Sequence, residues 1–219
     1  MFQTEEELVT RLVKHYNKYY TIQEVGVGYG ISDLLIIRNQ ADLIRFIETR
    51  QGVYLKDLDD IRVFDYIRKR KKVSLDELIS KLFISKSKLK YSILKRLEFS
   101  GAITHNAKFY SRNENFKLFC PNVIAIEAKL EDWQTGLAQA IRYHRFAEKS
   151  YLAIDDQYIH RVDKKELNNF NVGLISVGSK VKEIIKPILH KPLDPAMRYK
   201  VTEEIISRNS TKVDKPHLI

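Results

Sequence analysis

The sequence is very poor in cysteine, with Cys120 as the single example among 219 residues. One cysteine excludes an intramolecular disulfide and any cysteine-based zinc site. The six histidines are scattered, and no two of them stand at the spacing of a metal site. No apolar run approaches the roughly 18 residues that a membrane-spanning helix requires. Residues 1–7 are acidic and lack the basic and apolar regions of a signal peptide. We therefore expect a cytoplasmic protein without a membrane partner.

The composition is that of a globular chain with a real core, at 44% hydrophobic and 30% charged residues. Its length permits one large or two small domains. The net charge of +10 is unevenly distributed, because residues 61–112 hold 14 Lys and Arg against 4 Asp and Glu, whereas the rest holds 24 of each. Such a segment is typical of a module that meets phosphates. A solvated basic face has the same composition.

The segment Val123–Lys129 combines strand character with charge. It is β-branched and mostly apolar and follows the breaker Pro121-Asn122, which predicts a β-strand. Because strand side chains alternate, Glu127 and Lys129 point to the same face. A carboxylate and an ammonium side by side on an apolar strand are costly to bury without a function. Taken alone, the pair is also common at a solvent-facing sheet edge.

Two other predicted elements carry polar residues of this kind. Asp33 begins the apolar run 33–37, and Gln139 and Tyr143 stand four residues apart on one stripe of a predicted helix. Singly, these residues are typical of a turn and of a helix surface. An aspartate on one strand, Glu-x-Lys on the next and a helix with Gln-x-x-x-Tyr together resemble the PD-(D/E)XK nuclease superfamily. The Gln-x-x-x-Tyr element resembles its RecB-like branch.

This resemblance implies a metal-dependent site for phosphodiester hydrolysis. Asp33 and Glu127, on adjacent strands, would bind one Mg²⁺ (or Mn²⁺) together with the carbonyl of Ala128. Lys129 would orient or help deprotonate water and offset developing negative charge. Gln139 and Tyr143 would contact DNA or brace the site.

Many members of the superfamily add a glutamate from the first helix, and three glutamates begin that helix here. Glu5 is the best candidate, because it lies on the inward stripe of the helix, although an acid in this turn also favours the helix dipole. Glu7 is better explained as the partner of Thr4 in a capping box. Glu24, on the first predicted strand, is a weaker alternative.

Hydrophobic periodicity and turn residues predict the elements of that core. Glycines 26, 28 and 30 around Tyr29 predict a turn that joins the first two strands in a hairpin. Without residues 58–112 the order is αβββαβ, so the expected fold class is α/β with a restriction-endonuclease-like core. An inserted domain accounts for most of the 93 residues between Asp33 and Glu127. The predicted helices are 5–19, 41–49, 132–148, 164–170 and 201–208, and the predicted strands are 21–27, 31–37, 123–129, 151–154 and 172–177.

Residues 58–112 predict three helices and a small hairpin, which is the layout of a winged helix-turn-helix. Ser74 caps the second helix, and Ser85 or Ser87 caps the third, which ends at Ser100-Gly101. The third helix would lie in a major groove, with the wing around residues 105–108 touching backbone. A protein-interaction platform is the alternative. The residues expected to meet DNA, mostly lysines suited to phosphates, are Lys86, Lys88, Lys90, Tyr91, Lys95, Arg96 and Lys108.

The sequence therefore predicts a discontinuous nuclease-like core, residues 1–57 and 113–219, and a winged-helix insert, residues 58–112. The expected function is a metal-dependent DNA endonuclease that acts on double-stranded DNA, with a homodimer left open. A non-catalytic DNA-binding regulator on a nuclease-like scaffold is the alternative, and RNA cleavage is a third interpretation.

Overall fold

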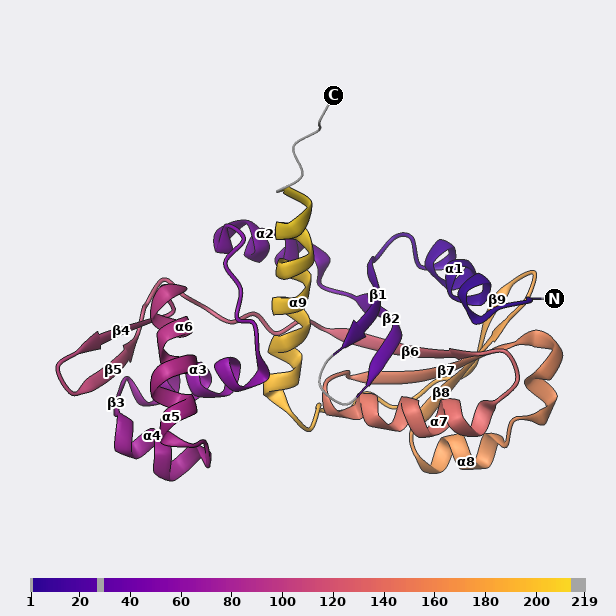
Figure 1. Cartoon of the computed structure of the whole chain (residues 1–219). Helices are drawn as coiled ribbons and strands as arrows, with labels where there is room; N and C mark the ends of the chain where they lie inside the picture. The colour runs from indigo at the N-terminus through magenta and orange to yellow at the C-terminus, as the bar shows by residue number, and fades with distance from the viewer. Residues whose placement is uncertain (1, 27–29, 214–219) are drawn as a thin grey trace. The chain divides into compact units, whose positions relative to one another are not determined.

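The computed structural model describes residues 2–26 and 30–213, which form a mixed α/β fold (Figure 1). Contacts divide the chain into two compact units, Met1–Asp42 with Pro121–Arg198 and Leu43–Cys120 with Tyr199–Ile219. Within the described residues, no helix is both long and apolar enough to cross a membrane.

The first unit is built on a six-stranded mixed sheet with the order β1-β2-β6-β7-β8-β9. β1 and β2 form the predicted hairpin, β2 pairs antiparallel with β6, the next two pairings are parallel, and β9 is antiparallel at the edge. The predicted turn at Gly28 and Tyr29 lies outside the described residues. The strands are β1 (Tyr20–Gly26), β2 (Ile31–Ile37), β6 (Val123–Lys129), β7 (Lys149–Asp155), β8 (Val172–Val177) and β9 (Val181–Ile185).

Helices cover both faces of this sheet (Figure 1). α1 packs on one face through Leu8 and Leu12, against Ile126 among others. α7 and α8 cover the opposite face, around Leu152 and Ile154. The helical segments are α1 (Glu5–His15), α7 (Trp133–Arg142), η2 (Tyr143–Arg145), η3 (Asp156–Arg161) and α8 (Lys164–Asn169).

Several element ends differ from the prediction. The Thr4 hydroxyl accepts the N–H of Glu7 (3.2 Å), as the capping pattern predicts. α1 stops at His15 rather than at residue 19, because the chain turns there and the Tyr19 N–H bonds the carbonyl of Tyr16. α7 passes into a 3₁₀ turn at Tyr143 instead of continuing to residue 148. β9 is not among the predicted strands, because its mostly exposed edge position leaves a polar pattern.

The second unit contains helices and a three-stranded sheet of order β3-β5-β4. Ser74 and Ser85 cap their helices as predicted, and Gly101 (φ +69°) follows the third. A π-helical turn, η1, interrupts that third helix. The elements are α2 (Gln40–Arg50), α3 (Leu58–Arg70), β3 (Lys72–Ser74), α4 (Leu75–Leu82), α5 (Lys86–Lys88), η1 (Leu89–Ile93), α6 (Leu94–Phe99), β4 (Ile103–Asn106), β5 (Phe109–Arg112) and α9 (Pro195–Val213).

A buried ion pair makes this unit larger than the predicted 58–112 insert. Arg50 and Glu203 have side-chain exposures of 4% and 0% and are joined by two hydrogen bonds of 3.0 and 2.9 Å. Glu203 also accepts the N–H of Leu55 (2.6 Å), and the Arg50 guanidinium lies 4.0 Å from the centre of the Phe116 ring. Because an unpaired buried charge is costly, these contacts hold α2 and α9 to the unit.

A pair of histidines joins the segment that follows β9 to the turn that follows α7. His144 Nδ1 lies 3.0 Å from His190 Nε2, and His144 Nε2 lies 3.0 Å from the carbonyl oxygen of Phe170. Burial, together with the charge of His190, lowers the pKa of His144 below its usual value. Burial therefore favours the neutral form of His144.

We predict that the free energy of unfolding falls as the pH drops below about 6.5, the pKa of an unfolded histidine. The unfolded chain takes up the proton first, so stability is lost as pH falls through the lowered pKa of His144. Urea denaturation at several pH values measures this. His144→Gln should flatten the dependence, whereas His160→Gln, at an exposed histidine, should leave it unchanged. An equal effect of both variants would contradict the assignment.

Candidate active site

The pairing of β2 with β6 brings together residues that are 95 positions apart. The antiparallel ladder ends at Leu34 and Ile126, so the next residues outward, Asp33 and Glu127, face each other. Asp33 Oδ2 accepts the N–H of Ala128 (2.7 Å). Because the N–H and C=O of one strand residue point to the same neighbour, the Ala128 carbonyl is directed to the Asp33 side as well.

Glu127 is the centre of the cluster, with only 1% of its surface exposed. The hydroxyl of Tyr143 donates a hydrogen bond to Glu127 Oε2 and lies 3.0 Å from the carbonyl oxygen of Ile31. Glu127 Oε1 lies 3.1 Å from Lys129 Nζ and forms an ion pair with it. The two oxygens of this carboxylate therefore have different partners, the Tyr143 hydroxyl and the Lys129 ammonium.

Lys129 extends the cluster to the first helix. Its Nζ lies 3.2 Å from Glu5 Oε2, and 14% of the side chain is exposed. A single ammonium thus bridges Glu5, on α1, and Glu127, on β6. Of the three N-terminal glutamates, the structure brings the predicted one to the cluster.

Burial sets the charge balance of the two facing carboxylates. It raises the pKa of Asp33, against which the Ala128 N–H and Lys129 act. Burial also raises the pKa of Glu127, and the charge of Asp33 adds to this, whereas Tyr143 and Lys129 oppose it. Burial therefore disfavours the charged form of both carboxylates.

Lys129 is charged at neutral pH. Burial disfavours its ammonium form, but the hydrogen bond and charge of Glu127, with Glu5 and Asp33, outweigh burial and raise its pKa. An ammonium has no lone pair with which to accept a proton. Its chemistry is therefore to donate hydrogen bonds and to stabilise negative charge, rather than to deprotonate water.

Gly136 is a residue that the sequence analysis missed. A Cβ atom at this position would lie 2.5 Å from Leu152 Cδ1 and 2.9 Å from Lys129 Cγ. The glycine lets α7 approach β6 closely enough to cover the alkyl stem of Lys129. A glycine inside an apolar helical pattern was the available signal.

Two further candidates are Gln139 and Glu24. The Gln139 Oε1 atom is buried and has no hydrogen-bond partner within the described residues. Glu24 has a positive φ of 52° and falls opposite Asp33, between the pairs that join β1 to β2. Its charge contributes to the raised pKa of Asp33. Glu24 is therefore close to the site, although it was the weaker alternative.

The predicted DNA-contacting side chains belong to the second unit, where two of them are held by acids. Arg96 is half-buried, contrary to the expectation that it is exposed, because it binds Asp60 through 3.0 and 2.6 Å hydrogen bonds and Asp57 at 2.9 Å. Lys88 pairs with Asp59 at 2.6 Å. The exposed side chains of the set are Lys86, Lys88, Lys90, Tyr91, Lys95 and Lys108.

The comparisons with known proteins add no identification. Searches against protein-family models, curated proteins and solved structures found no match. Within the described residues, no three His, Cys, Asp or Glu side chains are grouped to hold a metal ion. The ligands expected from the sequence, the carboxylates of Asp33 and Glu127 and the carbonyl of Ala128, include only two such side chains.

We predict that Tyr143→Phe lowers the free energy of unfolding by about 1–3 kcal/mol, because it leaves a buried acceptor without its donor. Urea denaturation measures the change. Tyr158→Phe is the matched control, since it removes a hydroxyl that makes no hydrogen bond in the described part of the chain. Equal losses in the two variants would show that the Tyr143 hydroxyl does not support Glu127.

Proposed function

We propose that the protein is a metal-dependent nuclease that hydrolyses phosphodiester bonds in DNA. The observation that carries the proposal is the cluster itself. Asp33, Glu127, Lys129, Glu5 and Tyr143 come from four elements and form one connected set at the end of two adjacent strands. Burying charged groups on an apolar sheet costs free energy. A catalytic role explains why these groups are buried together.

The order of elements supports a restriction-endonuclease-like core. Along the first unit, one helix precedes three consecutively paired strands, and a further helix leads into a parallel fourth strand. This is the αβββαβ order that the resemblance to PD-(D/E)XK nucleases implies. Between β2 and β6 in the sequence, α2 is followed by three further helical segments, α3, α4 and α5–η1–α6, and by the β4-β5 hairpin. These three segments and the hairpin are the elements that a winged-helix insert would have.

The residues of the cluster fit a hard divalent cation. Oxygen donors from carboxylates and backbone carbonyls are the ligands that Mg²⁺ and Mn²⁺ take. Asp33, Glu127 and the carbonyl of Ala128 would hold the ion, with the Lys129 ammonium beside it at Glu127 Oε1. When bound, such an ion polarises a phosphoryl oxygen and lowers the pKa of a bound water.

Three side chains of the cluster would have separate roles in hydrolysis. The Lys129 ammonium donates to the phosphate or to the attacking water and stabilises the negative charge that develops on phosphorus-bound oxygens. Glu5 holds that ammonium in place from the other side, at 3.2 Å. Tyr143 fixes the Glu127 carboxylate through its hydroxyl.

We predict Mg²⁺- or Mn²⁺-dependent DNA cleavage that falls about 100- to 1,000-fold in Glu127→Gln and Lys129→Met, the usual loss when one charge-stabilising group is removed. Supercoiled, linear and branched DNA are incubated with the metal or with EDTA. Mn²⁺ should also raise the melting temperature of the parent but not of Glu127→Gln. Glu131→Gln is the control, because this exposed residue follows the same strand and pairs with Arg161 instead.

Two results would contradict the nuclease. Cleavage that resists EDTA would refute the metal mechanism. DNA binding without cleavage of any substrate would favour the alternative, a non-catalytic regulator that keeps the fold as a scaffold. Cleavage of RNA in place of DNA would contradict the proposed substrate but would agree with the proposed catalytic residues.

We also predict that the basic helix of the second unit contributes phosphate contacts. Lys86, Lys90 and Lys95 are exposed and, unlike Lys88 and Arg96, have no acidic partner within the described residues. Each phosphate contact adds about −0.9 to the slope of log K against log salt concentration on duplex DNA and about −0.7 on single strands.

Replacing these three lysines with alanine should therefore flatten the slope by about 2–3 units. Fluorescence anisotropy over a salt series measures it. Lys164→Ala, Lys165→Ala and Lys180→Ala together, all in the first unit, remove the same charge and should change the slope less. An unchanged slope in the first variant would mean that this helix meets a protein.

A further inference from the structure

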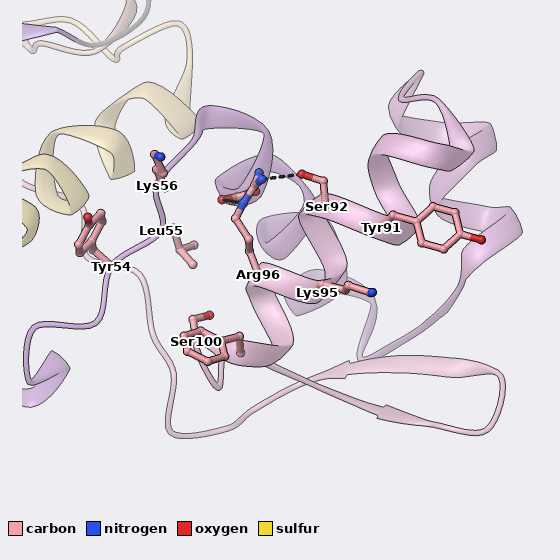
Figure 2. Close-up of a pocket in the computed structure, with 10 residues that line it drawn as sticks. Tyr54, Leu55, Lys56, Tyr91, Ser92, Lys95, Arg96 and Ser100 are labelled. Carbon is pink, nitrogen blue, oxygen red and sulfur yellow. Dashed lines mark hydrogen bonds and ion pairs between the residues drawn. The ribbon is translucent and has the colours of Figure 1, made fainter.

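A pocket of about 570 Å³ lies within the second unit, beside the basic helix (Figure 2). This volume is within the range of on the order of 300–1,000 Å³ that ligand pockets occupy. Tyr91 and Lys95 project from one side of the helix, and Tyr54 and Lys56 lie on the other side of Arg96. The lining residues are Tyr54, Leu55, Lys56, Asp60, Tyr91, Ser92, Lys95, Arg96, Phe99 and Ser100.

Three aromatic rings at this pocket are exposed to solvent. Phe99 is 97% exposed, Tyr91 is 62% exposed and Tyr54 is 36% exposed. Tyr91, Lys95 and Phe99 follow one another at four-residue steps along the helical segment. Large exposed rings on both sides of the helix that lines the pocket are typical of a binding surface rather than of a core.

The helix is distorted at one of these rings. Tyr91 lies in the π-helical turn Leu89–Ile93, between the regular segments α5 and α6. π-Turns are rare, and they occur frequently at functional sites. Leu89 and Ile93 on the same turn are fully buried, so the wider turn keeps the core contacts while Tyr91 points outward.

The lining of the pocket combines one buried acid with several cations. Asp60 is buried and binds Arg96 through two hydrogen bonds. Lys95 lines the pocket with its ammonium 5.9 Å from the centre of the Tyr91 ring, and Lys90, next to Tyr91 in the chain, lies 5.2 Å from the same ring. Lys56 contributes a further exposed cation.

A polyanion that also offers flat aromatic faces matches this combination. In duplex DNA the faces of the bases are covered by stacking, whereas in a single strand they are open to aromatic side chains. We propose that the pocket and its rims bind single-stranded nucleic acid, with bases stacked on Tyr91, Phe99 and Tyr54 and phosphates beside the lysines. Its link to cleavage rests on the proposed nuclease function, whose substrate would then contain an unpaired stretch.

The test measures binding by the full-length chain in EDTA, so that the result does not depend on catalysis. Fluorescence anisotropy compares oligo-dT with a duplex of the same length. Tyr91→Ala and Phe99→Ala should each weaken oligo-dT binding by roughly 5- to 150-fold, the effect of one lost base stack. Affinity for the duplex should fall less, because its stacked bases leave no open faces for these rings. Tyr91→Trp should retain oligo-dT binding.

Phe83→Ala is the matched control, because Phe83 is 95% exposed in the same unit but does not line the pocket. It should leave both affinities unchanged. Equal losses for oligo-dT and duplex, or no loss for oligo-dT, would overturn the stacking proposal. Displacement of oligo-dT by poly-glutamate as effectively as by unlabelled oligo-dT would also overturn it, since that polymer has charge without bases. A chain that binds oligo-dT selectively but never cleaves would refute only the nuclease.

Discussion

The pairing of β2 with β6 is the constraint on which the candidate site depends. It joins two strands that are separated by about 85 residues of chain, and it ends where the Asp33 carboxylate takes the N–H of Ala128 in place of a ladder partner. That one hydrogen bond fixes Asp33 opposite Glu127. The two carboxylates then share a buried environment, in which burial raises the pKa of each and the charge of Asp33 further raises the pKa of Glu127.

The remaining contacts of the cluster follow from the need to compensate Glu127. Tyr143 supplies a hydroxyl from the turn after α7, and Lys129 supplies an ammonium from the same strand. Gly136 lets α7 pack closely on the alkyl stem of Lys129. In the second unit, acids on and beside α3 likewise occupy Lys88 and Arg96. The remaining positive charge of that helix belongs to Lys86, Lys90 and Lys95, which lie near the exposed ring of Tyr91. A surface with cations and exposed rings fits a single strand with open bases better than a duplex.

Much of the secondary structure was predictable because it is encoded locally. β2, β6 and β8 match their predicted ranges, and Ser74 and Ser85 cap their helices, since periodicity and capping depend on neighbouring residues. β9 and the full length of α9 were not predictable. An edge strand lacks a buried face, and α9 is stabilised by Glu203 binding Arg50, 153 residues away.

Local sequence alone is enough to show which residues carry charge on strands and helices, and therefore that Glu127 and Lys129 share a face. It does not show that Asp33 faces Glu127 or that Glu5 reaches Lys129, because those contacts depend on how distant segments pack. The tertiary structure decided these contacts, and it also decided that Arg96 is neutralised by Asp60. Such partners are chosen by packing between distant segments, because the cost of burying a charge depends on what surrounds it in space.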